Sequence, residues 1–149
     1  MKADIDRFSH DLGVCEAFCE VVKAGVKRIA LSHPFTGAEL LEELHGDEFL
    51  SACKEIAEKY GCRTYHLREP LITDLFPVSM NLGKQNIVFY RNESDIDELL
   101  SIQRQKAELL LNGEYSGEAR RMIAVRYGHL LSYSDEAIER YLTSNNETE

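Results

Sequence analysis

Apolar residues recur at steps of three and four along the first part of the chain. The positions are Phe8, Leu12, Cys15, Cys19 and Val22. This spacing is typical of a helix with one buried face, and it predicts a helix from about Asp4 to Ala24. Gly25 is the expected stop, because helices commonly end at a residue that tolerates positive φ.

Three short apolar runs predict β-strands. They are Lys27–Ser32, Cys62–Leu67 and Asn86–Tyr90, and the last is apolar enough for the centre of a sheet. Between the first two runs, Thr36 and Glu39 have the spacing of a capping box, which predicts the start of a helix. The interval is long enough for a helical crossover, so we expect the first two strands to be parallel neighbours.

The chain between the second and third strands shows no clear period. Residues 68–85 contain two of the three prolines, with one further short strand conceivable at Leu71–Asp74. A loop of this length in a compact domain is often functional. Helical spacing returns after the third strand, where residues 92–131 predict a helical hairpin and Ser134 caps a last helix.

Together these elements predict a single domain of the α/β class. Residues 1–91 are expected to form a small sheet of three or four mainly parallel strands with flanking helices. Residues 92–143 are expected to add a C-terminal helical hairpin plus a cap helix. The polar residues 144–149 are expected to form a disordered tail.

Composition and charge exclude several classes of protein. A chain of 149 residues can bury roughly 70% of its unfolded surface, so it needs no metal or disulfide to hold a core. The net charge of −9 argues against nucleic acid as a partner, because phosphates require a basic surface. No run approaches the roughly 18 apolar residues of a membrane helix, and the first residues lack a secretion signal. We therefore expect a cytoplasmic protein that binds no membrane.

The chain has four cysteines, which are Cys15, Cys19, Cys53 and Cys62. Cys15 and Cys19 lie one helical turn apart, but this is not the spacing of a zinc ribbon and no matching ligand pair follows. We expect all four to be reduced and to pack as small apolar side chains. The alternative is a role in metal binding or redox chemistry. The sequence predicts no cofactor.

Polar residues follow two of the predicted strands. Ser32 and His33 end the first strand, and His66, Arg68 and Glu69 end the second. If these strands are parallel neighbours, the five residues share the carboxyl edge of the sheet, which is where α/β proteins bind ligands. The sequence therefore predicts a candidate site at this edge.

Thr36 at a helix start and Asp74 in the long loop are expected at the same edge. There His33, His66 and Asp74 are the candidate catalytic residues, because two imidazoles can act as acid and base near neutral pH. A small anionic ligand is expected to contact the remaining four, which are Ser32, Thr36, Arg68 and Glu69. Alternatives are a His–His–Asp metal site from the three catalytic candidates, or purely structural roles. His10 and His45 are expected to be solvated.

One segment carries a denser pattern than the rest. The run Gly-His-Leu-Leu-Ser-Tyr at residues 128–133 precedes a short amphipathic helix. This segment resembles the C-terminal helical element of a family of uncharacterised, mainly archaeal proteins, in which Gly-x-Leu-Leu-x-Tyr precedes a similar helix. Paired cysteines follow the turn in that family, whereas this chain has Glu136 and Ala137. The resemblance implies no activity, and a role tied to those cysteines does not transfer.

Two functions from different classes compete on these grounds. The first is a binding or interaction module that self-associates, because a small sheet leaves edges that proteins hide by pairing. The alternative is a small-ligand protein or enzyme that uses the edge around His33 and His66. A third function, nucleic-acid regulation through Arg120, Arg121 and Arg126, ranks last because of the net charge.

Overall fold

The computed structural model describes residues 4–149, and the chain forms two compact units. The first unit contains the described residues up to Pro70 together with Gly83–Arg91. The second unit contains Leu71–Leu82 and Asn92–Glu149. The chain therefore passes between the units three times, because residues 71–82 interrupt the first unit.

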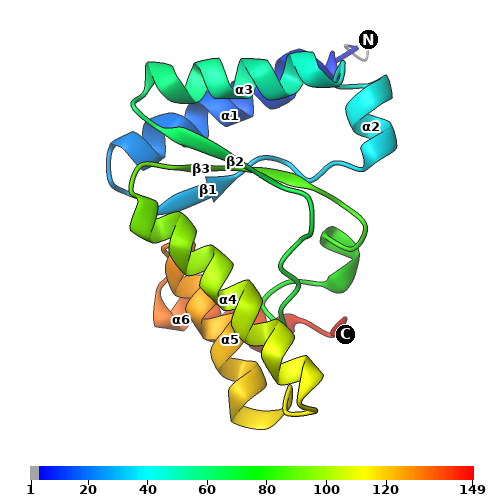
Figure 1. Cartoon of the computed structure of the whole chain (residues 1–149), viewed down its shortest axis with the longest axis vertical. Helices are drawn as coiled ribbons and strands as arrows, with labels where there is room; N and C mark the ends of the chain where they lie inside the picture. The colour runs from blue at the N-terminus through cyan, green and yellow to red at the C-terminus, as the bar shows by residue number, and fades with distance from the viewer. Residues whose placement is uncertain (1–3) are drawn as a thin grey trace. The chain divides into compact units, whose positions relative to one another are not determined.

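Three helices and three strands make up the described part of the first unit (Figure 1). They are α1 (Arg7–Lys23), β1 (Ile29–Leu31), α2 (Gly37–Glu42), α3 (Asp47–Lys59), β2 (Arg63–Leu67) and β3 (Asn86–Tyr90). Helix α2 begins with the predicted capping box. The Thr36 side chain accepts from the Glu39 N–H at 3.1 Å, and the Glu39 side chain accepts from the Thr36 N–H at 3.4 Å. Gly25 follows α1 with a φ of 78°, as expected for the stop signal.

The sheet of the first unit has the order β1-β3-β2, and both pairings are antiparallel. The prediction of an α/β domain with a mainly parallel sheet is therefore wrong, and so is the expectation that β1 and β2 are neighbours. β1 and β2 do run in the same direction, but β3 lies between them, with Phe89 opposite both Ala30 and Thr64. All five residues of β3 are buried, so the most apolar strand takes the central place although it comes last in sequence.

The core of the first unit lies between the sheet and two helices. Helices α1 and α3 pack against each other and against the strands (Figure 1). Phe35 and Phe49 meet edge to face with ring centroids 5.8 Å apart. All four cysteines are buried free thiols, and three of them come from these two helices. The thiols therefore serve as small core side chains, as their spacing predicts.

The described residues of the second unit form helices joined by turns and loops, with no strand. It contains the short 3-10 helix η1 (Val78–Met80) and the helices α4 (Glu93–Leu111), α5 (Gly117–Leu130) and α6 (Asp135–Ser144). Ser134 caps α6 as predicted, because its side chain accepts from the Ala137 N–H at 3.1 Å. Residues 71–74 form no strand in the structure. Among residues 4–149, no helix combines the length and apolar content needed to cross a bilayer.

Candidate metal centre

Most of the predicted site residues have structural roles within the fold. Ser32 is buried, and its Oγ accepts from the Ile87 N–H at 2.9 Å. The Ser32 carbonyl accepts from Asn86 Nδ2 at 2.8 Å. Ser32 thus extends the pairing of β1 with β3 by one residue, and Thr36 caps α2.

His66 and Asp74 also have partners away from His33. His66 Nε2 lies 2.7 Å from Oε1 of Gln85, whose backbone pairs with Phe35. Asp74 belongs to the second unit, where its carboxylate accepts two hydrogen bonds from Arg120, both at 2.7 Å. Arg68 and Glu69 follow β2 with exposed side chains. Within the described residues, no hydrogen bond, ion pair or ring contact joins His33 to His66.

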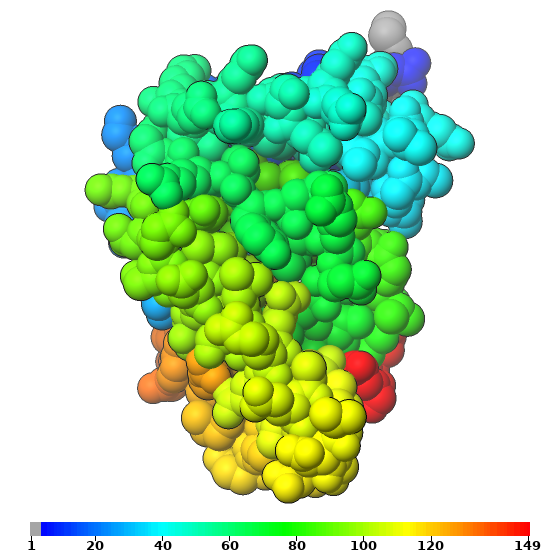
Figure 2. Space-filling model, in the orientation of Figure 1, coloured from blue at the N-terminus to red at the C-terminus, as the bar shows by residue number. Residues whose placement is uncertain are grey.

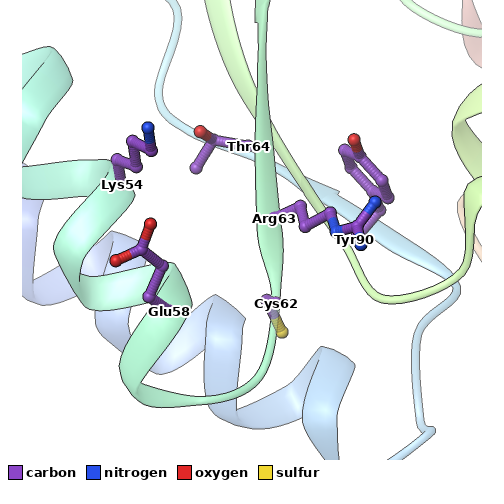
Figure 3. Close-up of a pocket in the computed structure, with 6 residues that line it drawn as sticks. All are labelled: Lys54, Glu58, Cys62, Arg63, Thr64 and Tyr90. Atoms are coloured by element: carbon purple, nitrogen blue, oxygen red, sulfur yellow. The ribbon is translucent and has the colours of Figure 1, made fainter.

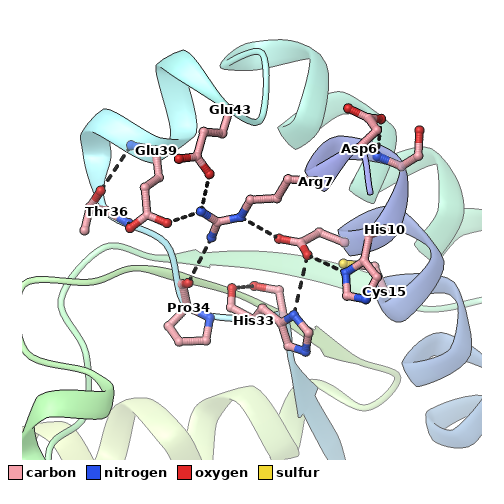
Figure 4. Close-up of polar contacts among 12 residues, drawn as sticks. Asp6, Arg7, His10, Cys15, His33, Pro34, Thr36, Glu39 and Glu43 are labelled. Atoms are coloured by element: carbon pink, nitrogen blue, oxygen red, sulfur yellow. Dashed lines mark hydrogen bonds and ion pairs between the residues drawn. The ribbon is translucent and has the colours of Figure 1, made fainter. Parts of the chain in front are cut away.

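His33 instead meets two residues of α1 (Figure 4). Its Nδ1 lies 3.5 Å from Oδ1 of Asp11, and Nδ1 of His10 lies 3.1 Å from the same oxygen. The two imidazole rings are 5.7 Å apart between centroids. One candidate ligand atom from each residue lies within 4.8 Å of the others. The loop after β1 and the first turns of α1 thereby form a His–Asp–His cluster, which we call the triad (His10, Asp11 and His33).

Asp11 is the buried centre of the triad. Its side chain is only 5% exposed, whereas those of His10 and His33 are 47% and 50% exposed. Nε of Arg7 donates to the other carboxylate oxygen, Oδ2, at 3.4 Å. This contact orients the carboxylate, so Oδ1 faces the two imidazoles while one side of the triad stays open to solvent.

Arg7 is itself held by several acceptors (Figure 4). Its Nη1 donates to Glu39 and to Glu43, the latter at 2.6 Å, and its Nη2 donates to the Pro34 carbonyl at 3.5 Å. Burial disfavours the charge on Arg7, but the hydrogen bonds to the two glutamates outweigh it and raise the Arg7 pKa. The same hydrogen bond from Arg7 lowers the pKa of Glu39. Arg7 therefore stays charged and ties α2 to the triad.

The spacing within the triad matches the edges of a coordination polyhedron. A metal ion with bonds of about 2.1 Å to nitrogen and oxygen keeps its ligand atoms about 3.0 to 3.4 Å apart in octahedral or tetrahedral geometry. The Asp11–His10 separation of 3.1 Å lies within this range, and the Asp11–His33 separation of 3.5 Å lies just above it. All three ligand atoms lie within 4.8 Å of one another, so a bound ion would draw the imidazoles slightly closer. Two imidazoles and one carboxylate are also the donor set that zinc and neighbouring transition metals prefer.

The charges around the triad favour a cation. Asp11, Glu39 and Glu43 supply three carboxylates, and the single positive charge of Arg7 is shared among all three. Two negative charges remain beside the imidazoles when these are neutral. An anion alone would be repelled here, whereas a divalent ion would complete the charge balance.

Sequence reasoning missed His10 and Asp11, although a signal was present. The predicted helix places Phe8, Leu12, Cys15 and Cys19 on its buried face, and Asp11 lies on that same face, four residues before Cys15. A carboxylate on an apolar helix face must find a partner when it is buried. Its neighbour His10 is then carried to the same end of the helix.

Apart from the triad, the first unit has a hollow beside the edge strand β2 (Figure 3). It has a volume of about 290 Å³ and is lined by Lys54, Glu58, Cys62, Arg63, Thr64 and Tyr90. Lys54 and Glu58 come from α3 on one side of β2, while Arg63 extends toward Tyr90 on the other side (Figure 3). Its charged groups are of both signs and largely exposed, so it lacks the buried, converging polar groups of the triad.

Comparison of the chain with protein-family models, curated proteins and solved structures gave no significant match. The function is therefore argued from the geometry of the triad.

Proposed function

We propose that the chain binds a divalent transition-metal ion through His10, Asp11 and His33. The observation that carries this proposal is the convergence of both Nδ1 atoms on one buried carboxylate oxygen, at 3.1 and 3.5 Å. Zinc is the expected ion, because it takes neutral imidazole and carboxylate ligands without a redox change.

Three protein ligands leave the ion with positions for water or substrate, which is the arrangement of catalytic rather than structural zinc. The half-exposed imidazoles place these positions at the surface. A bound ion would lower the pKa of its water toward about 7 and would attract an anionic oxygen of a small molecule. We therefore propose metal-assisted binding of a small anionic ligand, with hydrolysis as the chemistry that the open positions support.

Metal titration of the whole chain tests this function. Isothermal titration calorimetry with zinc, after removal of bound metal by a chelator, is expected to give one site per chain. His33→Ala and Asp11→Asn are expected to lose the site. His66→Ala is the matched control, because His66 bonds to Gln85 outside the triad, and it should bind zinc as the wild type does. Equal zinc binding by wild type and His33→Ala, or none by either, would refute the proposal.

Self-association is a second candidate, favoured by the edge position of β2. This five-residue strand has β3 on one side only in the described sheet, and Tyr65 at its middle is exposed. Such an edge can pair with a second copy of the chain. Light scattering is expected to show a dimer that Tyr65→Lys dissociates, and a monomeric wild type at micromolar concentration would exclude it. We also propose a cytoplasmic location, in keeping with four free thiols.

A further inference from the structure

The segment that follows α6 runs along residues 72–79 of the same unit (Figures 1 and 2). Asn145 Nδ2 donates to the Asp74 carbonyl at 2.9 Å, and the Glu147 carbonyl accepts from the Val78 N–H at 3.0 Å. The sequence predicts a disordered tail here. The described residues 145–149 instead make a series of hydrogen bonds to one surface.

Ser79 donates two hydrogen bonds to the Glu147 carboxylate. Its N–H lies 2.8 Å from Oε1 of Glu147, and its hydroxyl lies 3.1 Å from Oε2. With the Val78 N–H on the Glu147 carbonyl, three donors converge on a single residue of the tail. Donors that engage both oxygens of a carboxylate recognise a planar, charged group and not merely a polar one.

Two cations contact Glu149, the next acidic residue of the tail. Nζ of Lys106 lies 2.5 Å from Oε1 of Glu149, and it also donates to the Ile72 carbonyl at 2.7 Å. Nη2 of Arg120 lies 3.3 Å from the Glu149 carbonyl oxygen. Both cations lie against the ring of Tyr115, at 5.3 and 4.8 Å from its centroid. The ring holds both cations in place, and Asp74 also pairs with Arg120. Lys106 is therefore the cation that is preorganised for a carboxylate.

The surface beneath the tail also has a polar group without a partner and a hollow that the tail does not fill. The Tyr115 hydroxyl is buried and has no hydrogen-bond partner among the described residues. A hollow of about 330 Å³ lies against the tail residue Thr148, and its other lining residues are Asp74, Gly117, Arg120, Arg121 and Leu142. The tail thus covers only part of a surface that carries two arginines.

We propose that this surface, which we call the socket (Ile72, Asp74, Val78, Ser79, Lys106 and Arg120), is a binding site for an acidic, extended peptide segment. The chain's own residues 145–149 occupy the socket in cis as a displaceable competitor. The socket contacts alternate residues of the tail, which are Asn145, Glu147 and Glu149. The Asn145 side chain also accepts from the Glu147 N–H at 3.0 Å, which fixes the position of Glu147 relative to Asn145. The partner of the socket is therefore a segment with carboxylates two residues apart. This inference concerns the second unit and does not depend on metal binding.

Displacement is feasible because the contacts are on the surface. The Glu147–Ser79 hydrogen bonds are exposed, and the Glu149 side chain is 37% exposed although its partner Lys106 is only 11% exposed. Contacts to exposed carboxylates contribute little to stability. A tethered segment nevertheless has an effective concentration in the millimolar range. A competing peptide must overcome this, so the wild-type chain should bind such a peptide far more weakly than a chain whose tail has lost its charges.

The experiment uses the full chain and an amidated, fluorescein-labelled peptide of residues 144–149, followed by fluorescence anisotropy. Glu147→Gln/Glu149→Gln should bind this peptide at least about tenfold more tightly than wild type, because the cis competitor is weakened. A peptide with glutamine at both glutamate positions should not bind, and adding Ser79→Ala to the variant chain should weaken binding several-fold. Circular dichroism checks that each variant is folded.

Two results would overturn the proposal. One is equal binding of the charged and neutral peptides, or no binding by the folded variant at millimolar peptide. The other is a wild-type dimer by light scattering that dissociates in Glu147→Gln/Glu149→Gln, because the tail would then occupy the socket of a second copy and not its own.

Discussion

Nε of Arg7 lies 3.4 Å from Oδ2 of Asp11, one helical turn further along α1. The guanidinium satisfies the buried oxygen that does not face the imidazoles. Arg7 therefore has two effects on the triad: it keeps an almost buried carboxylate paired, and it leaves Oδ1 available to His10 and His33.

Removal of Arg7 should destabilise the metal-free protein. Arg7→Met leaves the Asp11 carboxylate buried without its cation, so the free energy of unfolding should fall by about 1 to 3 kcal/mol in urea titrations. Saturating zinc should recover part of this loss, because the ion supplies a new partner for Asp11. Arg7→Lys keeps the charge but loses the planar guanidinium that reaches Pro34 and two glutamates. Its free energy of unfolding should therefore lie between those of the wild type and Arg7→Met. A wild-type urea midpoint for Arg7→Met would contradict this role.

Ser32 is expected to act in the fold and not in ligand binding. Ser32→Ala leaves the buried Ile87 N–H without the Oγ acceptor at 2.9 Å. The expected cost is about 1 to 3 kcal/mol in the free energy of unfolding, with zinc affinity unchanged in the folded variant. Ser51→Ala, at an exposed position of α3, is the control and should be nearly neutral. A stable Ser32→Ala protein that no longer binds zinc would reverse the assignment.

Gly128 is required where α5 meets α6. A Cβ at this position would lie 2.6 and 2.7 Å from Cγ1 and Cδ1 of Ile138. Gly128→Ala should therefore lower stability by about 1 to 3 kcal/mol through overpacking, as measured by thermal unfolding.

A matched glycine gives the opposite expectation. A Cβ at Gly13, within α1, meets nothing within 4 Å, so Gly13→Ala should raise stability by about 0.5 to 1 kcal/mol. Trimming Ile138 to Ala in the Gly128→Ala background should relieve the clash. If Gly128→Ala were as stable as Gly13→Ala, the two helices would not be packed at this glycine.

The thiol core should make the protein sensitive to alkali. The neighbouring Cys53 thiol and burial raise the pKa of Cys15, and burial raises the pKa of Cys19 to about 12 and also raises that of Cys62. The unfolded chain ionises these thiols near pH 8.5, whereas the folded chain keeps them neutral. Stability is then fully present below that pH and falls as the pH rises toward the folded values.

Urea titrations at pH 7.5 and 9.0 measure this effect while most tyrosines, with an ordinary pKa of about 10, are still neutral. The free energy of unfolding should fall by up to about 1.4 kcal/mol per pH unit for each shifted thiol. Cys19→Ala should show a shallower fall than the wild type, although its stability at pH 7.5 is lower because a buried sulfur is lost. An identical pH slope in both proteins would show that the Cys19 thiol ionises equally in the folded and unfolded states.

Sequence patterns predicted the local structure well for physical reasons. The capping box of Thr36 and Glu39, the Ser134 cap and the stop at Gly25 depend on contacts within a few residues. The apolar run of Asn86–Tyr90 likewise defined a buried strand. Such signals are local, so the linear chain contains them in full.

The sequence predicts only one of the three triad residues. His33 follows a strand, which places it at the candidate site, and it does belong to the triad. The expected parallel sheet places its partners on the second strand and the long loop, which the structure does not bear out. The adjacent pair His10–Asp11 was visible only as a carboxylate on an apolar helix face.

What the sequence by itself determined is where most of the helices and strands lie and which side chains are apolar enough to be buried. Only the tertiary structure decided that β3 separates β1 from β2 and that α1 brings Asp11 to His33. Strand order depends on which long-range pairings bury the most apolar surface, and that comparison involves residues more than fifty positions apart. A pattern that spans only a few residues therefore does not predict the strand order.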